Sequence, residues 1–436
     1  MKKVLIITYY WIPSGGSGVQ RWVKFTKYLR EFGWEPIIYT PENPEFPTID
    51  PSFAKDIPSD ITVLKTPIWE PYNVYRQLTS KKNQPINAGF ISENKKHSWK
   101  DKLSVWLRGN FLIPDPRRFW IRPSVRYLTT FLNQNPVDAI ITTGPPHSVH
   151  FIGLGLKKQF PSLPWIADFR DPWTSIYYYK DLKIGWLADK IHHRLEKRIV
   201  QKADSVLVVS QGMKDEFDLL NPKKLNIISN GFDEDDIIIK ECSLDTKFSI
   251  SHIGLLTPKQ NPYVLWKVLK ELCTENEDFN SDLEIQLIGK VDFSIFDSIN
   301  QFGLENKLTK IAYLPHSKAI AKQQTSQLLL LLLMNEPGNK CILTGKLFEY
   351  LAAKRPILAF GPTDGDAATV INEAKAGSMI EFCDEKAAKK QILEYYSQYK
   401  LGKLTVLSES LQQFSRRNLT MQLAQTLDNH SGNAAS

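Results

Sequence analysis

The sequence is poor in cysteine and has no hydrophobic run long enough to cross a membrane. Only four of its 436 residues are cysteine, and these stand far apart, without the spacing of a metal site or a redox pair. The leucine run at 328–333 falls well short of the roughly 18 apolar residues that a spanning helix needs. These shortages argue against a disulfide framework and an integral membrane protein, and they favour a reducing, cytoplasmic setting.

Two ligand-binding motifs are also missing. The glycines at 15, 16 and 18 are not followed by the third glycine of the dinucleotide fingerprint, so we do not expect an NAD site. No convincing Asp-x-Asp metal motif occurs, because the acidic segment 233–236 follows a predicted strand and is interpreted as a solvated turn. The sequence therefore predicts neither a cofactor nor a bound metal.

The chain does contain enough apolar material for two large cores, with 42% hydrophobic and 11% aromatic residues. Apolar runs of strand length alternate with longer patterns of helical period, which is typical of parallel sheets covered by helices on both faces. We predict an α/β fold with strands near residues 3–9, 35–40, 61–66, 137–143, 164–169, 203–210, 247–253, 283–289, 308–313, 326–334, 355–360 and 376–382.

This order of strands predicts two doubly wound, Rossmann-like domains that face a cleft. We expect an N-terminal domain over residues 1–235 and a C-terminal domain over 236–415, linked around 224–245. Residues 416–436 are predicted to form a frayed tail and a helix that can cross back to the first domain. An insertion at about 69–135, rich in Trp, Tyr, Pro, Lys and Arg, interrupts the first domain.

The first candidate ligand site is the glycine turn after the first predicted strand. Gly15 and Gly16 precede Ser17, a residue type favoured at helix N-caps. Free amides at a helix start favour an anion, and glycine lets the backbone approach it closely. The alternative is an ordinary strand-to-helix turn, and this segment alone supports both interpretations about equally.

Two later loops follow predicted parallel strands and should lie at the carboxyl edge of the sheet, where ligands bind. They contain His147 in "TTGPPHSVH" and Asp168, Arg170 and Asp171 in "ADFRDPW". We predict His147, Asp168 and Asp171 as catalytic groups. The alternatives are a turn or cap for Asp171 and an ion pair between Arg170 and a neighbouring aspartate.

The second domain offers a candidate diphosphate site. Thr344 can cap a helix whose first amides, at residues 345–347, lack intrahelical acceptors, and Lys346 adds a positive charge there. Glu349 shares that helix face and can bond to sugar hydroxyls. The alternative is an i,i+3 ion pair between Lys346 and Glu349 on a solvated helix.

Several landmarks occur in a characteristic order: "SGGSGVQRWVKFTKYLREFGWEPIIYT", "ADSVLVVSQGMKDEF", "IISNGFD", "HIGLLTPKQNP" and "GKLFEYLAAKRPILAF". With them the chain resembles the GT-B glycosyltransferases, specifically the large retaining group called family four, over nearly its whole length. The last landmark is the most specific, because it resembles the nucleotide-binding signature of that family.

The resemblance implies roles for individual residues. Glu349 matches the glutamate that contacts the nucleotide ribose, Gly16 matches a glycine beside the donor phosphates, and His147 resembles a histidine that touches the donor sugar. The predicted donor-binding residues are Gly15, Gly16, Lys259, Thr344, Gly345, Lys346, Leu347 and Glu349.

Two positions depart from the family pattern. Cys341 stands where the first signature glutamate is expected, and Leu255 stands where an arginine is expected after Gly254. The usual basic pair is therefore reduced to Lys259, with Lys346 as the candidate for the missing charge.

The implied reaction is metal-independent transfer of a sugar, with retention, from a nucleotide diphosphate sugar to a hydroxyl acceptor. The expected setting is synthesis of a cell-surface polysaccharide or lipid-linked glycan. Two alternatives stay open: a nucleotide-sugar epimerase using Asp168 and Asp171, and a non-catalytic sugar-nucleotide or glycan-binding protein. A nucleic-acid partner is not expected, because the net charge of +8 is modest and no recognition motif occurs.

The segment from Trp99 to Tyr127 holds seven cations and two anions, and so five of the eight net positive charges. Its cations are interleaved with large aromatic residues, a combination suited to an anionic membrane surface at the cytoplasmic face. The alternative is that the aromatic residues pack this insertion onto the first domain, because Pro114, Pro116 and Pro123 prevent one continuous amphipathic helix.

Overall fold

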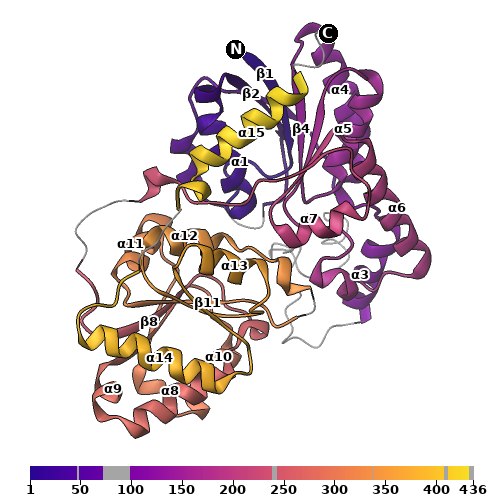
Figure 1. The fold of residues 1–436 in the computed structure, drawn as a ribbon. Coiled ribbons are helices and arrows are strands. Elements are labelled where there is room, and N and C mark those ends of the chain that lie inside the picture. The colour runs from indigo at the N-terminus through magenta and orange to yellow at the C-terminus, as the bar shows by residue number, and fades with distance from the viewer. Residues whose placement is uncertain (47–48, 72–98, 238–242, 337, 407–410, 432–436) are drawn as a thin grey trace. The chain divides into compact units, whose positions relative to one another are not determined.

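The computed structural model of the chain describes residues 1–46, 49–71, 99–237, 243–336, 338–406 and 411–431. Its contacts divide the chain into two units (Figure 1). Unit 1 contains residues 1–229 and 416–436, and unit 2 contains residues 230–415. The C-terminal helix therefore belongs to unit 1, and unit 2 begins at residue 230 where the sequence suggested 236. Of the predicted insertion, residues 72–98 lie outside the described residues.

Unit 1 is built on a parallel sheet of seven described strands in the order β3-β2-β1-β4-β5-β6-β7. The strands are β1 (Lys2–Thr8), β2 (Trp34–Pro41), β3 (Thr62–Thr66), β4 (Ala139–Gly144), β5 (Trp165–Phe169), β6 (Ser205–Val208) and β7 (Leu225–Ile227). The sequence predicted the first six. It placed β7 in the link, because three half-buried residues give no strand-length apolar run.

Helices cover both faces of this sheet (Figure 1). On one face, α1 (Ser17–Leu29) packs against α15 (Arg416–Ser431), and Trp22 and Leu423 share a core with Val4 and Ile6 of β1. On the other face, α5 (Ser148–Gln159) packs on β4 and lies beside α4 (Ile121–Gln134) and α6 (Trp186–Lys202). The other described helical segments of unit 1 are η1 (Arg30–Phe32), η2 (Pro51–Asp56), α3 (Trp99–Phe111), η3 (Pro116–Trp120), η4 (Tyr177–Leu182) and α7 (Gln211–Asp218).

Unit 2 contains a second parallel sheet, with six described strands in the order β10-β9-β8-β11-β12-β13. The strands are β8 (Phe248–Ile253), β9 (Leu283–Ile288), β10 (Leu308–Ile311), β11 (Leu328–Leu332), β12 (Ile357–Phe360) and β13 (Gly377–Ile380). All six were predicted. Both sheets show the doubly wound strand order, which confirms the predicted α/β class.

The leucine run owes its uniformity to burial on both faces of the unit 2 sheet. Successive side chains of a strand point to opposite faces, so Leu328 and Leu330 join one core while Leu329 and Leu331 join the other. The helical segments of the first core are α8 (Tyr263–Glu275), α9 (Glu277–Asp282), α10 (Phe293–Gln301) and α14 (Glu385–Lys400). Those of the second are α11 (His316–Thr325), α12 (Gly345–Ala353), α13 (Asp366–Glu373) and η9 (Leu411–Phe414).

Four short 3-10 segments complete unit 2: η5 (Glu234–Asp236), η6 (Pro258–Gln260), η7 (Glu305–Lys307) and η8 (Asn339–Cys341). Across the residues that the structure describes, none of the helices combines the length and the apolar character needed to cross a bilayer.

Candidate functional site

The start of α12 in unit 2 is an uncapped helix N-terminus. Thr344 is the N-cap residue, but its side chain makes no capping hydrogen bond, and its buried Oγ1 has no partner among the described residues. The Leu347 amide donates to the Thr344 carbonyl at 3.1 Å, so it is not free as the sequence suggested. The amides of Gly345 and Lys346 have no acceptor in the described chain, which leaves two donors at the positive end of the helix dipole.

Lys346 is held beside this N-terminus by two acceptors at the end of β8. Its Nζ donates to the Leu255 carbonyl at 2.8 Å and lies 3.2 Å from Nε2 of His252. Burial lowers the pKa of Lys346 to about 8, and the nearby Glu349 opposes that shift. The predicted positive charge is therefore present, and it titrates close to physiological pH.

His252, which sequence reasoning did not single out, is the neutral partner of Lys346. Burial, together with the charge of Lys346, lowers its pKa to about 3. Its Nδ1 lies 3.0 Å from the Leu330 carbonyl, which can only accept, so Nδ1 carries the proton. Nε2 then has no proton and a free lone pair, so it accepts from Lys346. Its 3.4 Å contact with the Leu255 carbonyl is not a hydrogen bond, because both atoms are acceptors.

Glycine makes room for this arrangement. Gly254 has a φ of +124°, and a Cβ there would lie 2.5 Å from Cε of Lys346. One turn into α12, the hydroxyl of Tyr350 accepts from the Ile253 amide at 3.0 Å. That bond ties α12 to β8, so the strand and the helix present Lys346 together.

The other two predicted side chains of unit 2 are already engaged. Oε2 of Glu349 accepts from the Gln323 amide at 3.1 Å, and no ion pair with Lys346 forms, so the simple i,i+3 alternative is wrong. Lys259 pairs with Glu336 at 3.1 Å, both about a third exposed. A donor contact by Lys259 therefore requires that this surface ion pair exchange, and the role stays a prediction.

In unit 1 the glycine turn shapes the start of α1. Gly16, with φ +100°, is the N-cap residue, where the sequence suggested Ser17, and Gly15 precedes it. A Cβ on Gly18 would lie 1.7 Å from Nη1 of Arg170, so a side chain there would have to displace the guanidinium. Arg170 in turn donates from Nε to the Gly144 carbonyl at 3.1 Å and from Nη2 to the Pro145 carbonyl.

Asp168 is a fully buried carboxylate at the end of β5. Its Oδ1 pairs with Arg21 at 2.9 Å, and its Oδ2 accepts from Trp22 at 2.9 Å and from Thr143 at 2.8 Å. These bonds join α1, β4 and β5, and they already explain why a carboxylate stands at this position. Its predicted catalytic role stays a prediction.

Asp171 differs, because it is only half-buried and makes no hydrogen bond with the described residues. Burial raises the pKa of Asp171, and the charge of Arg170 opposes the shift. A carboxyl group with a raised pKa and free oxygens is suited to accept or donate a proton.

His147 is the N-cap residue of α5 and stacks on Trp173, with ring centroids 4.7 Å apart and planes 6° from parallel. Its buried Nδ1 has no partner among the described residues, and burial holds its pKa well below the usual value. Trp173 is fixed by α6: its Nε1 donates to His192 at 3.1 Å and its amide lies 3.3 Å from Oε1 of Glu196. Sequence reasoning missed this support, although His192 and Glu196 lie four residues apart on one helix face.

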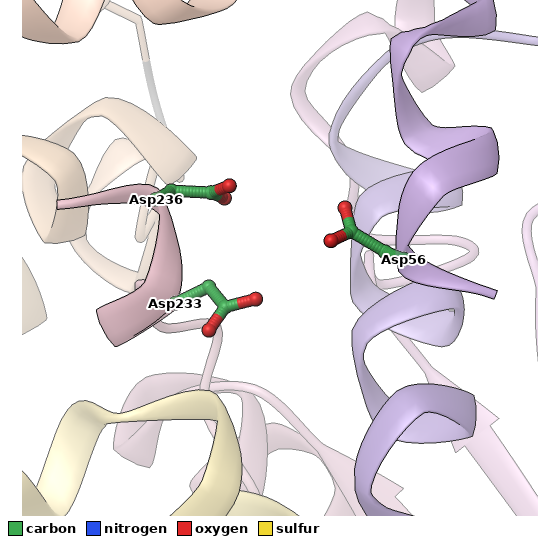
Figure 2. A group of neighbouring side chains, drawn as sticks. All are labelled: Asp56, Asp233 and Asp236. Atoms are coloured by element: carbon green, nitrogen blue, oxygen red, sulfur yellow. The ribbon is translucent and has the colours of Figure 1, made fainter. Parts of the chain in front are cut away.

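The acidic segment near the start of unit 2 is only partly solvated. Asp233 is buried and caps η5 by accepting from the Asp235 amide at 3.2 Å. Figure 2 shows Asp233 and Asp236 on this segment and Asp56 on η2 of unit 1. Asp56 is paired with Lys24 at 2.9 Å within its own unit. Because the three carboxylates belong to two different units, we assign no metal site to them.

The basic and aromatic segment of the insertion is partly internal. Arg117 is 6% exposed, pairs with Glu70 at 3.0 Å and lies over the Tyr9 ring. Trp120 is buried and stacks on Tyr39 at 5.0 Å. These two residues pack the insertion onto unit 1, whereas other members of the segment, such as Trp106 and Phe111, are exposed.

Comparison with known proteins points to sugar-transferring enzymes. Residues 89–236 match the profile described as Glycosyltransferase Family 4. Sucrose-phosphate synthase from Thermosynechococcus elongatus is similar over 100% of both chains, with a TM-score of 0.62 and 13% identity. Anabaena HepE, solved in complex with UDP-glucose, is similar over 98% of this chain and 100% of its own, with a TM-score of 0.59 and 13% identity.

A protein described as a UDP-N-acetylglucosamine 2-epimerase from Listeria monocytogenes is also similar, with a TM-score of 0.55, 10% identity and coverage of 99% of this chain and 97% of its own. No curated protein matches the sequence. At these identities the solved structures establish the fold, while the profile match supports sugar transfer. Residues 89–236 are therefore similar to Glycosyltransferase Family 4, and the whole chain shares the two-sheet α/β fold of these solved structures, as the sequence resemblance predicted.

Proposed function

We propose that the protein transfers a sugar from a nucleotide diphosphate sugar to a hydroxyl acceptor, and that unit 2 binds the donor at the start of α12. The observation that carries this proposal is the set of unused donors there: two free amides, the unpartnered Thr344 hydroxyl and the third proton of Lys346. A diphosphate supplies the oxygens and the negative charge that these donors lack.

The same donors suit the reaction as well as the binding step. When the bond between the sugar C1 and the diphosphate oxygen breaks, negative charge grows on the leaving diphosphate, and fixed N–H donors stabilise it. The acceptor oxygen forms the new bond to C1, and its proton passes to an oxygen of the leaving diphosphate. No carboxylate nucleophile is invoked, so the acceptor enters on the face that the leaving group vacates and the configuration is retained.

Glu349 is proposed to bind the nucleotide ribose with its second oxygen, because Gln323 already occupies Oε2. Gly15 and Gly16 are proposed to lie beside the donor phosphates, and His147 to act on the transferring sugar. For the acceptor we propose a glycan or a lipid-linked glycan at the cytoplasmic side of a membrane, in synthesis of a cell-surface polysaccharide.

Incubation with a panel of nucleotide sugars and analysis of the products tests the proposal, beginning with UDP-glucose, the ligand of HepE. A new acceptor–sugar bond supports transfer. A changed sugar without any acceptor would instead identify an epimerase, and binding without a product would identify a non-catalytic protein. Activity is expected to survive EDTA, and loss that magnesium or manganese reverses would refute the metal-independent mechanism.

A further inference from the structure

Two helices of unit 1 expose large hydrophobic side chains to solvent. On α3, Trp106, Leu107 and Phe111 are 41, 44 and 60% exposed. On α6, Trp186 and Leu187, its first two residues, are 74 and 64% exposed. Side chains of this size in adjoining positions are unusual on a surface that meets only water.

The exposed end of α3 lies next to the start of α6 (Figure 1). The side chain of Asn110 joins them, because its Nδ2 donates to the Lys183 carbonyl at 3.2 Å and its Oδ1 accepts from the Gly185 amide at 2.7 Å. Gly109 allows this close approach, since a Cβ there would lie 2.7 Å from the Leu182 carbonyl. Phe111 directly follows Asn110 and Trp186 directly follows Gly185. The exposed apolar residues of α3 and those of α6 therefore adjoin and form one surface, which we call the α3–α6 surface.

Positive charge surrounds the apolar part of the α3–α6 surface. Lys190 lies over the Trp186 ring at 4.7 Å. Ile191 follows Leu187 by one turn, and the same solvent face of α6 continues with exposed Arg194, Lys197 and Arg198. Within the described part of the chain, none of these four cations forms an ion pair. Along α6 the exposed face thus changes from apolar at its start to cationic at its end.

We propose that the α3–α6 surface binds the face of a membrane rich in anionic lipid. Amphipathic helices with aromatic and aliphatic residues on one side and Lys or Arg beside them lie in the headgroup region, where the rings reach the acyl boundary and the cations meet the phosphates. Trp186 and Phe111 are the residues that insert, and Lys190 and Arg194 are the residues that meet the headgroups.

A protein partner fits this surface less well. The central region of a protein–protein interface is depleted in lysine, whereas Lys190 stands over the most exposed ring of the α3–α6 surface. The surface also differs from the one that the sequence suggested, because Arg117 and Trp120 are internal and α6 was not considered.

The proposal goes beyond the sugar-transfer reaction, since binding to vesicles requires neither donor nor acceptor. Flotation of the full chain with vesicles of equal parts phosphatidylcholine and phosphatidylglycerol, at low and high salt, tests it without any enzyme assay. We expect binding at low salt that weakens as salt screens the headgroup contacts. Pure phosphatidylcholine vesicles should bind at least about tenfold less protein.

Substitutions test whether binding to vesicles depends on the α3–α6 surface or on exposed aromatic rings anywhere on the protein. The double variant W186S/L187S should bind at least about tenfold more weakly, because it removes the inserting side chains, and K190Q/R194Q should show a weaker salt dependence, because two of the four cations are gone. The control is F293S/Y313S in unit 2, whose rings are 70 and 73% exposed and lie outside the surface. All three variants should keep the thermal unfolding midpoint of the parent chain, because the altered side chains are exposed.

Three results would overturn the proposal. They are an absence of binding by the parent chain at low salt, equal binding by W186S/L187S, and a parent chain that self-associates without lipid while W186S/L187S does not. The last result would show that the surface is an interface between copies of the chain.

Discussion

Donor affinity should depend on pH through Lys346, and this dependence is the sharpest test of the site. In the protein without bound donor, burial lowers the pKa of Lys346 to about 8. A bound diphosphate favours the charged form, so the pKa of Lys346 must be higher in the complex. Below about pH 8 the lysine is charged in both states and affinity is constant. Above about pH 8 only the complex keeps the proton, so affinity falls by up to about tenfold per pH unit.

Between pH 7 and pH 9 the parent protein should therefore lose about tenfold in affinity for a nucleotide sugar. Lys346→Met removes a charge-assisted hydrogen bond worth about 1.5–3 kcal/mol, which corresponds to roughly 10- to 150-fold weaker binding at pH 7. The variant should then show no further decline at pH 9. Lys346→Arg keeps its charge throughout, so it should bind without the decline, and any titration of the ligand itself cancels in this comparison.

Isothermal titration calorimetry with UDP-glucose, in buffers of different ionisation enthalpy, measures the affinity and the protons taken up together. Lys354→Met is the matched control, since Lys354 is exposed at the other end of the same helix. Affinity for Lys346→Met equal to that of the parent at pH 7 would refute the assignment of Lys346. A parent affinity that stays flat from pH 7 to pH 9 would refute the lowered pKa of Lys346.

Three further outcomes are expected. His147→Ala should lower kcat more than donor affinity, because a contact with the transferring sugar matters most when the bond breaks; equal losses in both would remove His147 from the chemical step. Asp168→Asn should lower the free energy of unfolding in urea by about 3–5 kcal/mol, since it breaks a fully buried ion pair with Arg21, whereas full stability with lost activity would assign Asp168 to catalysis. Gly18→Ala should cost about 1–3 kcal/mol in the same measurement, because its Cβ meets Arg170; no loss would show that the loop can yield.

The fold was largely predictable because parallel strands leave long apolar runs and their order follows the chain. The leucines of β11 are an example, since burial on both faces removes any need for a polar residue. β7 was missed for the converse reason, because a short, half-buried edge strand has no such run. The joining of α15 to unit 1 was anticipated only as an option, because an amphipathic helix does not specify which core it completes.

The site was predictable where chemistry shows in residue type and spacing, as in Lys346 and Glu349 on one helix face. The site was not predictable in those places where a site residue contacts a residue of a distant strand. His252 stands 94 residues from Lys346, and nothing in its local sequence indicates that burial keeps it neutral. Similarly, "ADFRDPW" suggested three polar groups in one cleft, but nothing in its local sequence indicates that Asp168 is fully buried while Asp171 is half-buried.

The departure from the family pattern at Leu255 and the contacts of Lys346 concern the same place. An arginine is expected at 255, and the residue there contributes only its backbone carbonyl to the site. That carbonyl accepts a hydrogen bond from Nζ of Lys346 at 2.8 Å, so the cation of α12 lies beside Leu255, whose own side chain carries no charge. Gly254 leaves the space that the lysine stem occupies, and His252 supplies the second acceptor. The positive charge at this place is that of a lysine with a lowered pKa, whereas an arginine would keep its charge at any physiological pH. The cation beside residue 255 is therefore one whose charge responds to pH, and the affinity measurement between pH 7 and pH 9 tests it directly.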